Sequence, residues 1–273
     1  MRVVVLCSSP YSETGCAMAA RLAQAGHTPV GALSLPALDR ATLFRKFAQW
    51  GVRDSARFAW SKLAPPKKSS PTIRNPYLSG ALQYRGRTLR SLQEVSHEYG
   101  FPVVITREQN SSQSIQQLEQ WSPDVAVFTG GNILRKTLLA VPRFGVINSH
   151  LALLPEIRGM SSPEWSLLQG VPLGITIHLM DTGIDTGATL QRREFHDLDG
   201  CDSFTDLRNR MISFGMEMVV ESIAGLEDGT ISPRSQPDTD VDRQFFVMHE
   251  WLKSQAAVRL GVRPSVSVEG SSE

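Results

Sequence analysis

The sequence lacks any long hydrophobic run, although 41% of its 273 residues are hydrophobic. No apolar stretch approaches the ~20 residues that a membrane-spanning helix requires. The first ten residues, MRVVVLCSSP, have neither the charged first region nor the long apolar region of a signal peptide. We therefore expect a protein without a membrane span or a secretion signal.

Cysteines are few, and none of them is close to another. Cys7, Cys16 and Cys201 are odd in number, widely spaced and without a CxxC pair. This pattern excludes a disulfide framework and a thiolate metal site. No HExxH sequence is present either, so we expect no metal. The reducing cytoplasm is the location that this cysteine usage favours.

Charge is nearly balanced over the whole chain, at +1, but it is unevenly distributed. Residues 39–92 contain twelve Lys or Arg and only two acidic residues, a local balance of +10, which leaves −9 for the rest. Such segregation suggests a surface that meets something anionic. The alternative interpretation is a basic loop that is merely solvated.

Hydrophobic patterning predicts an α/β protein. Residues 2–7 form an apolar, β-branched run typical of a buried parallel strand, followed by a helix over 15–25 and a strand over 29–35. Strand, helix and strand in this order are a βαβ unit. Beyond residue 88 the alternation resumes. Helices are expected at 89–99, 112–121, 134–140, 164–169 and 202–227, and strands at 102–106, 124–129, 144–149, 173–180 and 188–195.

We therefore expect a Rossmann-like fold with a mostly parallel twisted sheet, helices on both faces and an antiparallel edge. The predicted organisation has three parts. Residues 1–200 form a catalytic domain, in which 39–92 is a basic, partly helical insertion. Residues 201–263 form a C-terminal helical extension, and 264–273 a disordered tail.

Two polar residues close the strand Gly-Val-Ile-Asn-Ser-His. Asn148 and His150 are two positions apart, so they point to the same side of the strand. Ligands of open α/β sheets bind at the carboxyl edge of the strands. An amide and an imidazole there could together stabilise a developing oxyanion. The alternative is a strand-end histidine whose hydrogen bonds are all structural.

The segment Asp-Thr-Gly-Ile-Asp-Thr-Gly at 181–187 holds two carboxylates and two glycines. Asp and Gly both favour turns, so this segment could be a turn and nothing more. It could also present an acid to the pocket, and a carboxylate near His150 would favour the charged imidazole.

Taken together, these patterns are more specific than either alone. The sequence N-x-H-x-x-L-L-P-x-x-R-G, then about 25 residues, then D-x-G-x-D-T-G resembles the formyltransferase family that uses 10-formyltetrahydrofolate as donor. The resemblance covers 88–195 well, the first βαβ unit loosely and 36–87 poorly. Some members also have a histidine at the position of His178, whose role stays open.

The resemblance implies a set of site residues. The catalytic positions fall on Asn148, His150 and Asp185, with protonated His150 kept charged by the acid. The folate-binding positions fall on two segments. These are Asn132, Ile133 and Leu134 in the first, and Met180, Asp181, Thr182, Gly183 and Ile184 in the second.

The departures from the family concern the acceptor. The loop SSPYSETG after the first strand has one glycine, which makes a ribonucleotide phosphate there doubtful, and the C-terminal barrel of the tRNA enzyme is not evident. We expect formyl transfer to a primary amine of a small, anionic acceptor, such as an amino sugar on a nucleotide, and no nucleic-acid partner. Alternatives are a 10-formyltetrahydrofolate hydrolase and a methionyl-tRNA formyltransferase without the usual C-terminal domain.

Two further alternatives are a binding regulator without turnover and a peripheral membrane protein that uses 41–63. The sequence leaves open the identity of the acceptor and the oligomeric state, a homodimer included. It does not decide whether 39–92 contacts substrate, a partner or only solvent.

Overall fold

The structure is a computed structural model that describes residues 1–37, 73–237 and 244–261. The chain divides into two compact units, Met1–Val146 and Ile147–Glu273. Most of the predicted basic insertion and the whole predicted tail lie outside the described residues. The domain boundary predicted at residue 200 stays a prediction. Among the described helices, none is both long enough and apolar enough to cross a membrane.

Unit 1 is built on a parallel sheet with the strand order β6-β1-β2-β5. The central strand β1 is buried from its second residue onward, which explains its continuous run of valines. The strands are β1 (Arg2–Cys7), β2 (Thr28–Ser34), β5 (Val103–Ile105) and β6 (Val125–Phe128).

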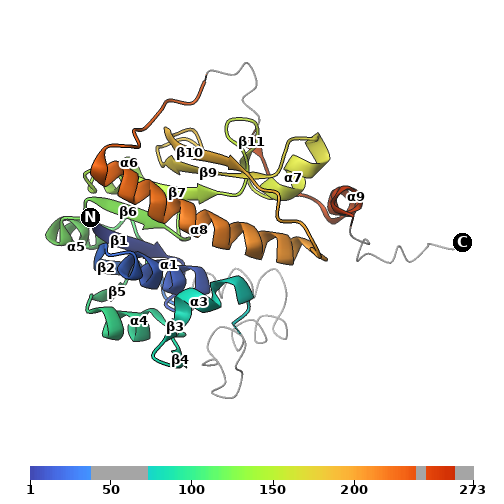
Figure 1. The fold of residues 1–273 in the computed structure, drawn as a ribbon. Coiled ribbons are helices and arrows are strands. Elements are labelled where there is room, and N and C mark those ends of the chain that lie inside the picture. The colour runs from blue at the N-terminus through green and yellow to red at the C-terminus, as the bar shows by residue number, and fades with distance from the viewer. Residues whose placement is uncertain (38–72, 238–243, 262–273) are drawn as a thin grey trace, which may run out of the picture. The chain divides into compact units, whose positions relative to one another are not determined.

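Helices cover both faces of this sheet. Crossovers between parallel strands are right-handed, so the helices leading from β1 to β2 and from β2 to β5 lie on one face, and the helix leading back from β5 to β6 on the other. The first two helices contact each other (Figure 1). They are α1 (Glu13–Gln24) and α4 (Leu92–Tyr99), and the third helix is α5 (Ser112–Trp121), followed by the short α6 (Lys136–Leu139).

Hydrogen-bonding side chains set where these helices begin. The hydroxyl of Ser12 accepts from the N–H of Gly15, so α1 starts at Glu13, two residues before the predicted start. Ser111 caps α5 in the same way, and this helix has its predicted bounds. The described end of the predicted insertion forms four short elements. They are η1 (Pro76–Leu78), α3 (Ser79–Leu82), β3 (Gln83–Tyr84) and β4 (Arg87–Thr88).

Unit 2 contains the antiparallel part of the fold, with β7 and β10 on either side of β9. The long helix α8 lies against β9 and β10 (Figure 1). At Gly215 this helix leaves no room for a side chain, because a Cβ there would lie 2.3 Å from the hydroxyl of Ser149 on β7. The bounds are β7 (Val146–His150), β9 (Gly174–Leu179), β10 (Thr189–Glu194) and α8 (Phe204–Asp228).

A second, two-stranded sheet in unit 2 joins distant parts of the sequence. Strand β8 (Arg158–Gly159) pairs in parallel with β11 (Gln244–Phe245). The helices α7 (Ser162–Gln169) and α9 (Glu250–Leu260) follow these strands and contact each other. The segment downstream of α8 therefore packs against the segment that follows β7.

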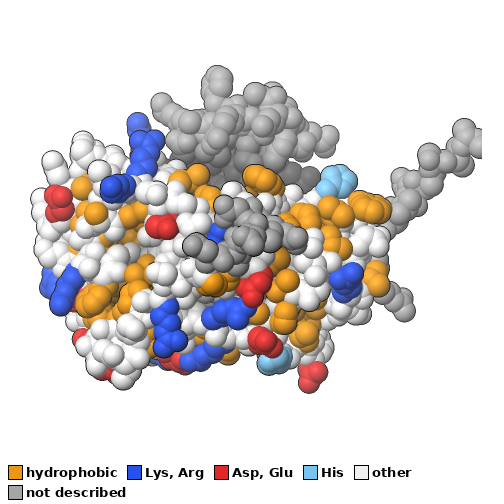
Figure 2. Space-filling view, turned by 90° about the horizontal axis from the view of Figure 1, so that it is seen from above, with side chains coloured by type: hydrophobic (Ala, Val, Ile, Leu, Met, Phe, Trp, Pro, Cys, Tyr) orange, Lys and Arg blue, Asp and Glu red, His pale blue; other side chains and the backbone are white. Residues whose placement is uncertain are grey.

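Fold class agrees with the prediction. Unit 1 supplies the parallel, Rossmann-like part with helices on both faces, and unit 2 supplies the antiparallel strands. On the face drawn in Figure 2, the Lys and Arg side chains are interspersed with acidic and hydrophobic ones. Of the twelve Lys and Arg of residues 39–92, eight lie outside the described part, and four, Arg74, Arg85, Arg87 and Arg90, lie within it.

Candidate active site

Strand β7 places Asn148 and His150 on the same side, as their spacing predicts. The amide Nδ2 of Asn148 lies 3.1 Å from Nε2 of His178, its register partner on β9. The imidazole of His150 crosses that of His178 edge-on, with 6.4 Å between the ring centroids. An amide and two imidazoles thus converge at the end of β7.

His178, whose role the sequence left open, connects two of the predicted catalytic residues. Its Nδ1 donates to the carbonyl of Leu179 at 3.0 Å, so the hydrogen-bond network assigns Nε2 as the acceptor for Asn148. The same Nε2 lies 3.5 Å from Oδ1 of Asp185. The side chain is almost fully buried, which fixes this geometry.

Asp185 reaches the histidines from the loop after β9. Its Oδ2 lies 3.5 Å from Nδ1 of His150 and accepts the backbone N–H of Gly159 at 2.8 Å. Burial by itself raises the pKa of this carboxyl. The interactions with His178 and His150 and the hydrogen bond from the N–H of Gly159 outweigh burial and hold the pKa at about 2. Asp185 is therefore ionised throughout the physiological range.

His150 differs from the expectation that it is protonated. Burial in unit 2 lowers its pKa, and the charge of Asp185 raises it by less than burial lowers it. Nε2 donates to the carbonyl of Ile157 at 2.8 Å, which leaves the Nδ1 lone pair on the side of Asp185. The resting imidazole is thus a neutral base beside a fixed carboxylate.

The two carboxylates of residues 181–187, Asp181 and Asp185, have different structural roles. Oδ1 of Asp181 accepts the N–H of Gly183 at 3.0 Å and the hydroxyl of Thr186 at 2.6 Å, so Asp181 shapes the turn. A Cβ at Gly187 would lie 1.8 Å from the carbonyl oxygen of Leu179, so only glycine fits there. The turn is thereby fixed for Asp185 to point at the histidines.

The remaining predicted folate residues of this segment lie on its surface. Thr182, Gly183 and Ile184 are exposed, and Met180 is half-buried. The isoleucine is a large apolar side chain with 38% of its surface exposed. This exposure leaves the segment open to contact with a ligand.

Unit 1 contains the other predicted folate segment, 132–134, at the carboxyl end of β6. Ile133 is 79% exposed, whereas Leu134 is buried. Two neutral amides hold the backbone: Oε1 of Gln109 accepts the N–H of Asn132 at 3.0 Å, and Nδ2 of Asn110 donates to the carbonyl of Ile133 at 2.9 Å. The loop therefore offers an apolar side chain on a fixed backbone.

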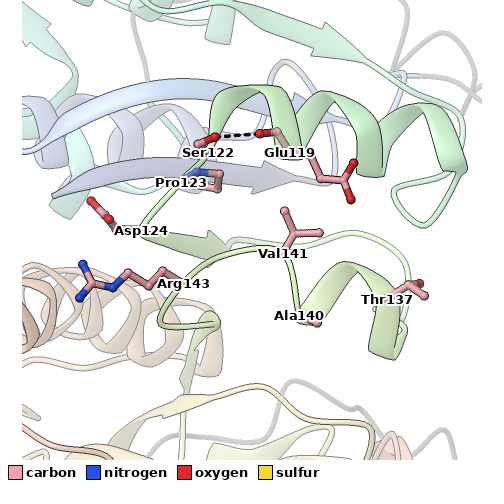
Figure 3. Close-up of a pocket in the computed structure, with 8 residues that line it drawn as sticks. All are labelled: Glu119, Ser122, Pro123, Asp124, Thr137, Ala140, Val141 and Arg143. Carbon is pink, nitrogen blue, oxygen red and sulfur yellow. Dashed lines mark hydrogen bonds between the residues drawn. The ribbon is translucent and has the colours of Figure 1, made fainter.

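The cavity drawn in Figure 3 lies at the amino end of β6, the opposite edge of the unit 1 sheet from that loop. Its carboxylate Asp124 already accepts the backbone N–H of Arg2 at 2.8 Å, and the hydroxyl of Ser122 donates to the carbonyl of Glu119. Ligands of such sheets bind at the carboxyl edge, so this cavity does not change the site assignment.

The buried thiol of Cys7 does not compete with the cluster as a nucleophile. Burial raises the pKa of the Cys7 thiol to about 12, which keeps it from acting as a thiolate nucleophile. Within residues 1–37, 73–237 and 244–261, no group of three or more His, Cys, Asp or Glu side chains is placed to hold a metal ion.

Two groups that hold Asp185 in place could not be predicted from the sequence. The N–H of Gly159 binds the Asp185 carboxylate, and the amide of Gln236 donates to the carbonyl oxygens of Asp185 and Gly187, both at 2.8 Å. Gly159 belongs to a recognisable motif, but a backbone donor has no residue-type signature. Gln236 follows Asp185 by 51 residues and lies in a polar segment without a periodic pattern.

The chain is similar to known proteins of one family. The sequence profile of a family described as formyl transferase matches residues 83–223, about half of the chain. The chain is 34% identical over 150 residues to methionyl-tRNA formyltransferase of Pelobacter propionicus. The aligned residues make up 54% of this chain and 47% of that protein. The chain spans about half the length of the curated relatives it matches.

Solved structures show the same fold at low sequence identity. Glycinamide ribonucleotide transformylase 1 from Symbiobacterium toebii has a TM-score of 0.56 and 16% identity, covering 87% of this chain and 95% of that one. A sugar N-formyltransferase from Shewanella sp. FDAARGOS_354 has a TM-score of 0.54 and 14% identity, and the superposition covers 97% of this chain and 90% of that one.

Proposed function

Because the chain belongs to the formyl transferase family, we propose that it transfers a formyl group from 10-formyltetrahydrofolate to the primary amine of a small, anionic acceptor. The observation that carries the proposal is the cluster of Asn148, His150, His178 and Asp185 in unit 2. The cluster combines a fixed amide donor, a neutral base and an ionised carboxylate, which formyl transfer to an amine requires.

Asn148 stabilises the charge that builds on the formyl oxygen. A carboxamide has two N–H donors, and one of them is directed to Nε2 of His178 at 3.1 Å. The second remains for the formyl oxygen. Because His178 holds the amide in place, the donor needs no reorganisation when the charge develops, and such a fixed donor accounts for ~10²–10³ in rate.

His150 takes up the proton of the attacking amine. In the transfer, the bond from the formyl carbon to the donor nitrogen breaks, and a bond to the acceptor nitrogen forms. The acceptor nitrogen loses a proton to Nδ1 of His150, and the proton then passes to the leaving nitrogen. Asp185, 3.5 Å from that Nδ1, stabilises the imidazolium while it exists.

The donor supplies an activated formyl group, and the two predicted folate segments fit such a ligand, each by its own geometry. Ile133 in unit 1 and Ile184 in unit 2 are exposed apolar side chains suited to a flat ring. Gln109 and Asp181 each fix the backbone next to these residues through hydrogen bonds.

The anionic acceptor rests on the +10 charge balance of residues 39–92. A second candidate acceptor is methionyl-tRNA, because relatives at 34% identity are methionyl-tRNA formyltransferases. We place the reaction in the cytoplasm, since the three cysteines, Cys7, Cys16 and Cys201, are free thiols.

A mass-resolved acceptor screen tests this function. The protein is incubated with 10-formyltetrahydrofolate and, in separate reactions, a nucleotide-linked amino sugar, glycinamide ribonucleotide, initiator methionyl-tRNA or no acceptor. We expect a gain of one formyl group on the amino sugar and none without the Asp185 carboxylate, tested with Asp185→Asn. Formylation of the tRNA alone would support the second candidate. Stoichiometric formate release without any acceptor would instead identify a hydrolase.

A further inference from the structure

Asp185 has a backbone conformation that needs external support. Its φ of +55° lies in the left-handed region, which is costly for a residue with a side chain. Such a conformation persists where surrounding contacts fix it. The contact that fixes it here comes from outside the matched family segment.

Gln236 supplies this contact with both ends of its amide. Its two Nε2 hydrogens point to the carbonyl oxygens of Asp185 and Gly187, each at 2.8 Å. Its Oε1 accepts from the guanidinium of Arg158 at 3.0 Å. The residue after this arginine, Gly159, donates its N–H to the Asp185 carboxylate. A single planar amide thus connects the backbone of the acid with the strand that holds its carboxylate.

The same downstream segment also fixes β8 through its backbone. The carbonyl of Phe245 accepts the N–H of Met160 at 2.9 Å, and a Cβ on Gly159 would lie 2.1 Å from that oxygen. The indole of Trp165 donates to the carbonyl of Phe246 at 2.8 Å and stacks on the ring of Phe245. Without these contacts, the N–H that binds Asp185 would lose its fixed position.

We propose that Gln236, in the described residues 229–237 that follow α8, is a positioning residue for Asp185. The inference rests on the proposed function, in which Asp185 acts on His150. It goes beyond the family match, which ends 13 residues before Gln236.

The charged and polar groups around Asp185 allow the positioning role of Gln236 to be measured through the pKa of Asp185. The carboxylate faces His150 from β7, His178 from β9 and the N–H of Gly159 from β8. The guanidinium of Arg158, beside Gly159, donates to Gln236. When Gln236 no longer fixes the loop, the carboxylate spends less time against these partners. Its pKa then rises from about 2 toward the ordinary value for an aspartate.

The test compares Gln236→Leu with Gln116→Leu, the same exchange at an exposed position on α5 in unit 1. The pKa of Asp185 is followed by carbon-13 NMR of labelled aspartates and assigned with Asp185→Asn, and kcat is measured with the acceptor found in the screen. We expect Gln236→Leu to raise the pKa of Asp185 and to lower kcat at least tenfold. Gln116→Leu is expected to change neither.

If Gln236→Leu does not fold, as judged by circular dichroism, Gln236→Asn replaces it. The shorter amide cannot span both carbonyls and is expected to give a smaller change of both quantities in the same direction. An unchanged Asp185 titration in a folded Gln236 variant would overturn the positioning role. Because the titration needs no substrate, absence of formyl transfer by the wild type would count only against the proposed function.

Discussion

The two predicted folate segments are held in opposite ways. In unit 1, the neutral amides Gln109 and Asn110 fix the loop that exposes Ile133. In unit 2, the loop after β9 carries an ionised, largely buried Asp185 against His150 and His178. The amides that fix the first loop carry no titratable group, whereas the carboxylate of the second loop and the buried His150 shift each other's pKa. The first loop is therefore suited to binding and the second to chemistry.

The largest effect should come from Asp185→Asn, which keeps the shape and removes the charge. Without the carboxylate, the imidazolium of His150 loses its stabilising partner, and we expect turnover to fall by roughly 10³-fold or more. The pKa of His150, already lowered by burial, should fall further. Steady-state kinetics and nitrogen-15 NMR of the imidazole measure the two changes.

Asp181→Asn is the matched control for that exchange. Asp181 accepts its hydrogen bonds from Gly183 and Thr186 within its own turn, so turnover should suffer far less. Greater damage from Asp181→Asn than from Asp185→Asn would mean that the catalytic acid has been assigned to the wrong carboxylate.

The next effect concerns the strand-end residues Asn148 and His150. Replacing either with alanine should reduce turnover at least about 10²-fold, because one removes the oxyanion donor and the other the base. Thermal unfolding should show that the variants remain folded, since both residues lie at the end of β7. Retention of a third of the wild-type rate by either variant would rule out its assigned role.

The unit 1 loop should respond differently. Ile133→Ser removes an apolar contact worth ~1.5–3 kcal/mol when buried by a ligand, so we expect the donor KM to rise about tenfold. Because Ile133 is 79% exposed in the protein alone, folding stability should stay within about 0.5 kcal/mol of wild type. A fall in kcat with an unchanged KM would mean that the unit 1 loop, like the loop after β9, acts in the chemical step and not in binding.

Local sequence signals predicted most of the described fold. The valine run of β1 and the capped helix α5 have the predicted bounds, because burial and capping are encoded by neighbouring residues. The family inferred from the joint motif is confirmed by the profile match. Short elements such as β8 and β11 could not be predicted, since each exists only through its pairing with the other.

The site was predictable only where one strand or one loop contains it. Asn148 and His150 share a side of β7 by periodicity, but the partnership of Asn148 with His178 depends on the register of β7 against β9. The contact of Gln236 with Asp185 spans 51 residues and depends on the path of the chain after α8. The protonation of His150 depends on burial, which the motif does not reveal.

The smallest effect should come from the basic segment 39–92, whose residues Arg45, Lys46, Arg53, Arg57, Lys62, Lys67 and Lys68 lie outside the described part of the structure. Reversing Lys67 and Lys68 to glutamate should raise the acceptor KM roughly threefold or more and leave the donor KM unchanged, because an ion pair in contact with water contributes ~0.2–1 kcal/mol. The effect should shrink at 0.5 M salt, because the dissolved ions screen charges that lie more than a few ångströms apart. Equal losses for donor and acceptor, or a changed mass in sedimentation, would assign the segment a structural role and would leave binding of the anionic acceptor to other residues.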